Sequence, residues 1–145
     1  MSMAPVEMSY ERRTYLGLDF LEADSVPPAR ETRARVRFRG DEFFFEGHRL
    51  AGKPLLPGTV LQELMLAACQ PINRPGLWGA LAKVYHANFF SPAFAGEELE
   101  VRAKLLRELG GARRVSCEVV RGAELVANGE FLLLADRERI PGGSA

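Results

Sequence analysis

The second half of this chain consists largely of segments in which apolar and polar side chains alternate. Residues 97–109, 113–121 and 124–135 each have this period of two, which is typical of strands with one buried face. In the first of them the inward set is Leu99, Val101, Ala103 and Leu105. Glycines at positions 110–111 and 122 separate consecutive segments and favour tight turns. The pattern therefore predicts neighbouring antiparallel strands.

Two earlier segments also have strand character. Residues 81–90 lead to Ser91-Pro92, where the pattern ends. Residues 32–39 alternate between apolar side chains and arginines, and Gly40-Asp41 ends that alternation. The arginines, which we call the arginine row, are Arg33, Arg35, Arg37 and Arg39.

One segment has the composition of a helix. Residues 60–70 follow Pro57-Gly58 and stop at Pro71, and Thr59 is placed to cap the first turn. Apolar side chains occupy so much of this helix that we expect it to be buried nearly all round. Glu63 is then the exception that needs explaining. One such helix and several long antiparallel strands indicate an α+β fold with the helix on one face of a curved sheet.

Composition limits the possible functions. The chain has 145 residues, 19 basic and 19 acidic side chains and 47% hydrophobic residues, which indicates one globular domain and argues against a general nucleic-acid binder. We expect a flexible lead at 1–12, a single domain at 13–136 and a disordered tail at 137–145. No apolar run approaches the roughly 18 residues of a membrane helix.

The cysteines and histidines argue against a disulfide framework and a metal site. Cys69 and Cys117 each lie in an apolar pattern with no second cysteine nearby in the sequence, so we expect buried free thiols and a reducing, cytoplasmic setting. The only histidines, His48 and His86, have no ligand spacing between them. We expect no metal and no cofactor, and we interpret His86 as a half-buried strand residue.

The segment 43–68, FFFEGHRLAGKPLLPGTVLQELMLAA, carries the chemistry. It places His48 in a glycine-flanked loop, then Pro57-Gly58, then Glu63 one turn into an apolar helix. Here the sequence resembles the bacterial 3-hydroxyacyl-acyl-carrier-protein dehydratases of the hot-dog fold, whose signature is roughly F-x-G-H-F-P-x-x-P-x-x-P-G-x-x-x-x-E. Residues 86–97, HANFFSPAFAGE, resemble the family's later strand K-A-R-F-x-x-P-V-x-P-G-D.

The resemblance implies a reversible dehydration of 3-hydroxyacyl thioesters carried on acyl carrier protein. His48 would remove the α proton, and Glu63, its pKa raised by burial, would protonate the leaving β-hydroxyl. The free backbone N–H near Gly58, at the positive end of the helix, would stabilise the thioester oxygen as it gains negative charge. The resemblance also implies a homodimer with the site at its interface.

The sequence departs from the family pattern around the histidine. The spacing from His48 to Pro54 is one residue longer, and Arg49-Leu50 stands where the family has Phe-Pro. We therefore expect either a bulged loop or a shifted histidine. The family's Gln four residues after the acid is Ala67 here, and its N-terminal motif has no counterpart.

An apolar tunnel for the acyl chain is a further expectation. Pro57 would contact substrate, and five residues are candidates for the tunnel wall: Leu77, Trp78, Phe89, Phe90 and Phe94. The arginine row is either a solvated strand face or a docking patch for an acidic carrier protein.

Two other function classes stay open at this stage. A hot-dog thioesterase could use Glu63 to activate water, and a non-catalytic subunit could pair with an active dehydratase. The sequence leaves open the acyl chain length, the pathway and whether dimers assemble further.

Overall fold

A computed structural model describes residues 16–23, 29–72 and 78–136 of the chain. Its strands are β1 (Asp19–Ala23), β2 (Glu31–Val36), β3 (Arg49–Leu50), β4 (Lys53–Pro54), β5 (Trp78–Phe89), β6 (Leu99–Leu109), β7 (Ala112–Arg121) and β8 (Glu124–Asp136). Its helices are η1 (Phe43–Phe45), α2 (Gly58–Ala67) and η2 (Gln70–Ile72), of which η1 and η2 are 3₁₀ turns. The expected lead at 1–12, the tail at 137–145 and Leu77 lie outside the described residues.

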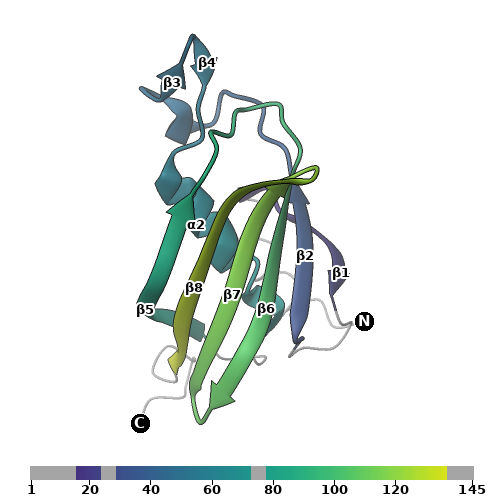
Figure 1. Ribbon diagram of the computed structural model, residues 1–145, viewed down its shortest axis with the longest axis vertical. Helices are drawn as coiled ribbons and strands as arrows, with labels where there is room; N and C mark the ends of the chain where they lie inside the picture. Colours follow the sequence, from purple (N-terminus) through teal and green to yellow (C-terminus); the bar gives the residue numbers. More distant parts are fainter. Residues whose placement is uncertain (1–15, 24–28, 73–77, 137–145) are drawn as a thin grey trace.

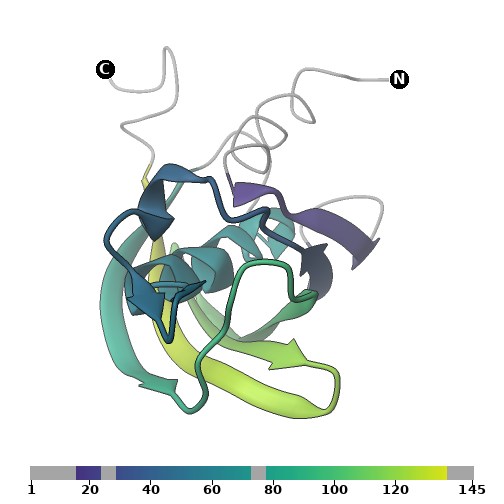
Figure 2. The same ribbon diagram turned by 90° about the horizontal axis from the view of Figure 1, so that it is seen from above.

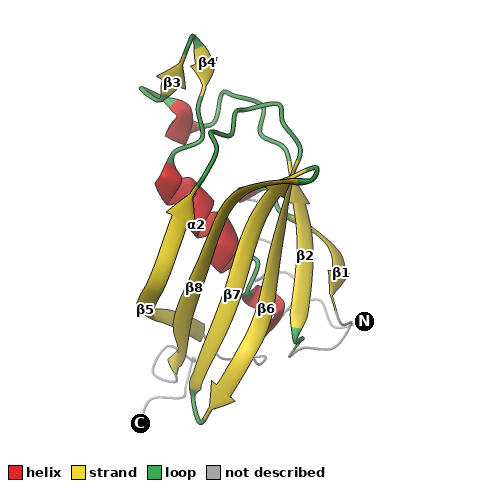
Figure 3. Cartoon of the chain, viewed as in Figure 1, coloured by secondary structure: helices red, strands yellow, loops and turns green. Residues whose placement is uncertain are grey.

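The architecture is one curved sheet wrapped around one helix (Figures 1 and 2). Six strands follow the order β1-β2-β6-β7-β8-β5, and every neighbouring pair is antiparallel. Figure 3 shows that α2 is the main helix among the described residues and that it lies behind the sheet. The α+β hot-dog fold expected from the sequence is therefore confirmed.

The alternating patterns place their apolar residues against the helix. On β6 and β7 the buried positions include Val101, Leu105, Val115 and Val119, and they pack with Leu64 of α2 in one core. The β6–β7 hairpin turns at the expected glycines, since Gly110 has a φ of 58°. Strands thus form where the sequence predicts them, and they form because alternation buries one face of each.

Two cross-links join α2 to the sheet inside this core. The hydroxyl of Thr32 on β2 donates to the carbonyl oxygen of Ala68 at 2.5 Å, which accepts beyond the last helical turn. Cys69 and Cys117 are both buried and free, as expected, and their sulfur atoms lie 3.6 Å apart. The hydrogen bond with the Cys69 thiol and burial raise the pKa of Cys117, which disfavours the thiolate form of Cys117.

Two expectations about the helix are wrong. It begins at Gly58 instead of Val60, and Thr59 makes no capping hydrogen bond, because Pro57 in extended conformation is the N-cap residue. Nor is α2 buried all round: Gly58, Thr59 and Glu63 are exposed in the single chain. The helix packs chiefly on β6, β7 and β8.

Candidate active site

The extra residue after His48 is absorbed by a small hairpin. Arg49 and Leu50 of β3 pair with Pro54 and Lys53 of β4, and the two-residue turn has φ values of 52° at Ala51 and 81° at Gly52. Positive φ at both central positions is typical of the turns that match strand twist. The loop therefore neither bulges irregularly nor loses its hydrogen bonds. The hairpin projects beyond the end of the sheet (Figure 1).

His48 lies at the base of this hairpin. Its carbonyl oxygen accepts from the Leu55 N–H at 2.9 Å, and its own N–H donates to the Phe45 carbonyl oxygen at 2.9 Å. The ring is exposed, and Nδ1 lies 3.2 Å from the carbonyl oxygen of Glu46. A protonated Nδ1 would donate to that oxygen, which leaves Nε2 with its lone pair free as a base.

The two segments that resemble the dehydratase motifs lie side by side. The Leu56 N–H donates to the Ala93 carbonyl oxygen at 2.8 Å, and the Ala95 N–H donates to the Pro54 carbonyl oxygen at 3.1 Å. Leu55 and Phe94 form an isolated bridge between these two bonds. These hydrogen bonds fix the direction in which the strip formed by residues 54–56 leads into α2. Pro57 and Gly58 follow this strip directly in the sequence.

The start of α2 meets the end of β5. A Cβ added at Gly58 would lie 3.6 Å from the Phe89 ring, so the glycine backbone faces this aromatic side chain. Val60 and Leu61 donate to the Pro57 carbonyl oxygen, whereas no hydrogen bond occupies the Gly58 N–H among the described residues. The structure thus brings Gly58 and Phe89 together, beside an open N–H at the positive end of a helix.

The other residues predicted to contact substrate differ in their exposure and in their position along the chain. Phe90 is 57% exposed, and Phe94 is half-buried with the Lys53 ammonium 5.9 Å from its ring centroid. Pro57 is half-buried at the helix start. Trp78 opens β5 at the far end of the strand from Phe89.

Glu63 does not meet His48 within one chain. Its side chain is exposed on α2, and no hydrogen bond or ion pair joins it to His48 among the described residues. Apolar side chains of β5 are also exposed: Leu81 is 42% and Val84 is 41% exposed. A single chain therefore presents the acid, the base and an apolar strand edge without enclosing them.

One anchoring residue escaped the sequence analysis. Arg121, at the end of β7, donates to the Pro92 carbonyl oxygen and to Glu97, each at 2.8 Å, and to Glu124 at 2.7 Å. Glu97 in turn accepts from the Phe94 N–H at 2.8 Å. The hydrogen bonds to Glu124 and Glu97 raise the pKa of Arg121 above its usual value. The sequence offered one signal for this anchor, which is Glu97 in the later motif. Its partner Arg121 is distant in the sequence, so the pairing itself was not predicted.

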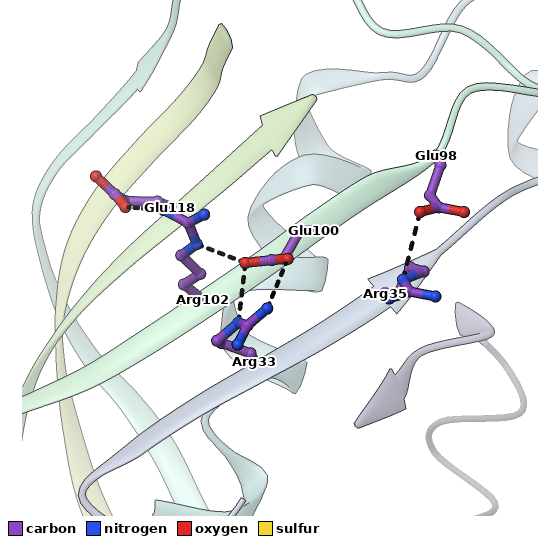
Figure 4. Close-up of polar contacts among 6 residues, drawn as sticks. All are labelled: Arg33, Arg35, Glu98, Glu100, Arg102 and Glu118. Atoms are coloured by element: carbon purple, nitrogen blue, oxygen red, sulfur yellow. Dashed lines mark hydrogen bonds and ion pairs between the residues drawn. The ribbon is translucent and has the colours of Figure 1, made fainter. Parts of the chain in front are cut away.

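Each member of the arginine row pairs with a carboxylate, and Figure 4 shows the pairs of Arg33 and Arg35. Arg33 binds Glu100 through Nε at 3.1 Å and Nη2 at 3.3 Å, while Arg35 and Arg37 both pair with Glu98. Arg39 pairs with Asp41 at 3.1 Å. Hydrogen bonds from Arg33 and Arg102 hold the pKa of Glu100 below its usual value. These pairs leave the arginine row with little uncompensated positive charge.

The remaining polar groups give no metal centre. Within residues 16–23, 29–72 and 78–136, no group of three or more His, Cys, Asp or Glu side chains could hold a metal ion. His86 lies on β5, 3.8 Å from Glu130, and its ring is 45% exposed. No helix in the described part of the chain is long and apolar enough to cross a membrane.

Comparison with known proteins decides the family. Residues 20–121, well over half of the chain, match the family model described as the polyketide synthase dehydratase domain. The chain belongs to this family of hot-dog thioester dehydratases. The match includes β2, the histidine hairpin, α2 and all of β7, so the dehydratase family assignment covers every candidate site residue.

Two curated relatives agree with this dehydratase assignment. An uncharacterised thioester dehydrase from Halalkalibacterium halodurans is 30% identical over 106 residues, which are 68% of this chain and 67% of the relative. The 3-hydroxyacyl-acyl-carrier-protein dehydratase FabZ from Anaeromyxobacter is 28% identical over 109 residues, or 68% of each chain.

Solved structures show the same fold at lower identity. The PaaI protein from the phenylacetic acid degradation operon of E. coli has a TM-score of 0.71, with 18% identity and coverage of 90% of this chain and 92% of that one. A hypothetical thioesterase from Streptococcus pneumoniae, solved with coenzyme A, has a TM-score of 0.68, with 9% identity and coverage of 93% and 97%.

Proposed function

We propose that this protein is a hydro-lyase that interconverts 3-hydroxyacyl and 2-enoyl thioesters, the acyl group being carried on acyl carrier protein. The observation that carries the proposal is the arrangement at the start of α2. Gly58 faces the Phe89 ring and has an N–H that no hydrogen bond occupies among the described residues, and the acid Glu63 lies on the same helix. The strip 54–56 leads directly into this helix and also pairs with His48 at the base of its hairpin.

In the proposed reaction His48 Nε2 takes the proton from the carbon next to the thioester. The electron pair of that C–H bond moves toward the thioester oxygen, which the Gly58 N–H stabilises. The bond between the β carbon and its hydroxyl then breaks, and the carboxylic acid of Glu63 gives that hydroxyl a proton. Water and an enoyl thioester are the products, and the proton taken by His48 regenerates the acid through solvent.

A second copy of the chain would complete this site. Strand β5 is an edge of the sheet and exposes Leu81 and Val84, and Glu63 is exposed on α2. Two identical edges related by a two-fold axis pair antiparallel, and each chain then covers the open side of the other. Covering Glu63 would favour its neutral, proton-donating form, because burial penalises a charged carboxylate. It would also bring His48 of one copy toward Glu63 of the other.

The deciding experiment follows the absorbance of the enoyl thioester, with free thiol measured in parallel. A crotonyl thioester on carrier protein or on pantetheine is supplied to the wild type, His48→Ala and Glu63→Gln. We expect hydration in the wild type and a loss of about 10²–10⁴-fold in each variant, the usual size of a general acid–base contribution. His86→Ala and Glu118→Gln are matched controls on the sheet and should keep full activity.

Other outcomes would assign a different function. Release of free thiol that depends on Glu63 would make the protein a thioesterase, the class named for its Streptococcus pneumoniae structural neighbour. No reaction from a folded protein, with carrier-bound substrates of several chain lengths, would contradict catalysis and favour a non-catalytic partner subunit.

A further inference from the structure

The outer face of the sheet carries a row of three cations, of which only Arg114 has a carboxylate partner among the described residues. In the strand register Arg107 of β6 lies opposite Arg114 of β7, which lies opposite Leu132 of β8, which lies opposite Lys83 of β5. These four residues therefore cross the sheet side by side on one face. Arg107 and Arg114 lie close to the turn that joins β6 to β7, and Lys83 lies at the middle of β5. Figure 1 shows these strands.

Charge pairing differs sharply between this row and the arginine row. Arg114 shares Glu130, whereas Arg107 and Lys83 are exposed and form no ion pair among the described residues. Two arginines directly opposite on neighbouring strands repel each other, which costs the sheet stability. In the arginine row, by contrast, Glu98 and Glu100 compensate the cations that face them.

Apolar surface lies beside these cations. Leu109, Ala112 and Leu134 form the next cross-strand row on the same face, and Leu109 is 61% and Leu134 43% exposed. The Tyr85 ring is held between Arg114, 3.8 Å from its centroid, and the Lys83 ammonium, 4.7 Å away. We call this surface the basic patch. It consists of Lys83, Tyr85, Arg107, Leu109, Arg114, Leu132 and Leu134.

We propose that the basic patch is the docking surface for the acyl carrier protein, an inference that rests on the proposed function. The partner is one that presents carboxylates next to small apolar side chains, so that its charges offset Lys83 and Arg107 while its apolar residues cover Leu109 and Leu134. Complementary charges of this kind steer a partner and fix its orientation, and salt weakens them. In the arginine row, considered for this role from the sequence, every arginine already has a carboxylate partner, and Arg35 and Arg37 share Glu98.

The patch reaches the sheet edge that the proposed dimer would use. Lys83 and Tyr85 lie at the middle of β5, which is an edge strand of the sheet. When two β5 edges pair antiparallel, the basic patches of the two copies therefore approach their shared edge.

The test uses an acyl carrier protein in its apo form, which lacks the prosthetic arm and therefore cannot react. Its affinity is measured by titration at low salt for the full-length wild type, Lys83→Glu, Arg107→Glu and the matched control Arg37→Glu. We expect each patch variant to weaken binding by about tenfold or more, since a reversed charge repels the partner. Arg37→Glu should change binding little, and high salt should weaken binding of the wild type. Melting curves verify that each variant is folded.

A second arm separates docking from chemistry. With a crotonyl pantetheine thioester, which has no carrier to dock, Arg107→Glu, which lies on β6 away from the β5 edge, should keep the wild-type kcat/KM. With crotonyl carrier protein its KM should rise while kcat is kept. Because the first arm needs no reaction, it stands even if the protein proves not to be a dehydratase.

Several results would overturn the docking assignment. One is equal loss of binding in Arg37→Glu and the patch variants, and another is no loss in any of them. Absence of apo-carrier binding to the wild type at low salt would do the same. So would binding of the patch to vesicles of anionic phospholipid without binding to the carrier, because the partner would then be a lipid surface.

Discussion

At the scale of single residues, a few polar atoms inside the core fix how the helix sits on the sheet. Thr32 is only 1% exposed, and its hydroxyl reaches the Ala68 carbonyl oxygen that the end of α2 leaves free. On the sequence it is one polar residue in an alternating strand. In the fold its hydroxyl donates the hydrogen bond that joins β2 to the end of the helix.

Thr32→Val should therefore destabilise the protein although the two side chains have nearly the same shape. The Ala68 carbonyl oxygen would lose its hydroxyl donor in a buried place, which costs about 1–3 kcal/mol. Thr32→Ser keeps the hydroxyl and should cost less. Chemical denaturation of both variants measures the difference, and equal stability of Thr32→Val and wild type would show that the bond contributes nothing.

Ala51 shows how one residue resolves a departure from the family pattern. It has a φ of 52°, a backbone conformation that residues other than glycine adopt at some energetic cost. That conformation, followed by Gly52, makes a two-residue turn and converts the longer His48–Pro54 segment into paired strands. The sequence Ala-Gly does not predict such a turn, because the usual turn sequence is Asn-Gly or Asp-Gly.

At the scale of elements, the geometry of the site depends on the hydrogen bonds that connect its loops. Arg121 reaches across from β7 to the loop after β5, and that loop holds the strip that leads into α2. Arg121 contacts none of the proposed reacting groups. It is a positioning residue, and its effect on Gly58 is transmitted through the backbone pairs of Ala93 and Ala95.

Arg121→Met should lower kcat toward a pantetheine thioester by about 10- to 100-fold, since small displacements of a positioned group are costly. Arg121→Lys should recover part of this loss, because an ammonium can still reach Glu97 or Glu124. The measurement is kcat and KM for both variants beside their melting temperatures. A similar loss of stability in both, with no recovery of kcat by lysine, would reduce Arg121 to a purely structural residue.

At the scale of the whole molecule, the single chain is incomplete on the side of β5. One edge strand of 12 residues has exposed apolar side chains, and the proposed acid is exposed on α2. Long exposed edges invite pairing with another chain. The proposed homodimer uses that edge and encloses the site in the same step.

Val84→Lys should convert the dimer into a monomer and abolish activity, since it places a charge in the middle of the expected interface. Leu109→Lys makes the same chemical change at an exposed leucine away from β5 and should leave the dimer intact. Light scattering after size-exclusion chromatography measures both. A dimeric, active Val84→Lys protein would contradict pairing through β5.

The sequence by itself predicted most of the fold. Alternation placed β2, β6, β7 and β8 to within a few residues, and the glycine turns and the buried cysteines also agree with the structure. Such features are local, because a period of two or a turn glycine acts over neighbouring residues only. The family assignment from the residues around His48 and Glu63 is confirmed as well, while their catalytic roles stay predictions.

Only the tertiary structure decided which surfaces are covered and which charges are paired. Glu63 is exposed where an apolar helix suggested burial, because α2 covers part of the sheet and leaves its β5 side open. The arginine row is compensated by Glu98 and Glu100, whereas Arg107 and Lys83 are not compensated. Burial and charge pairing depend on strand order and register, which bring together residues far apart along the chain, and no local pattern encodes them.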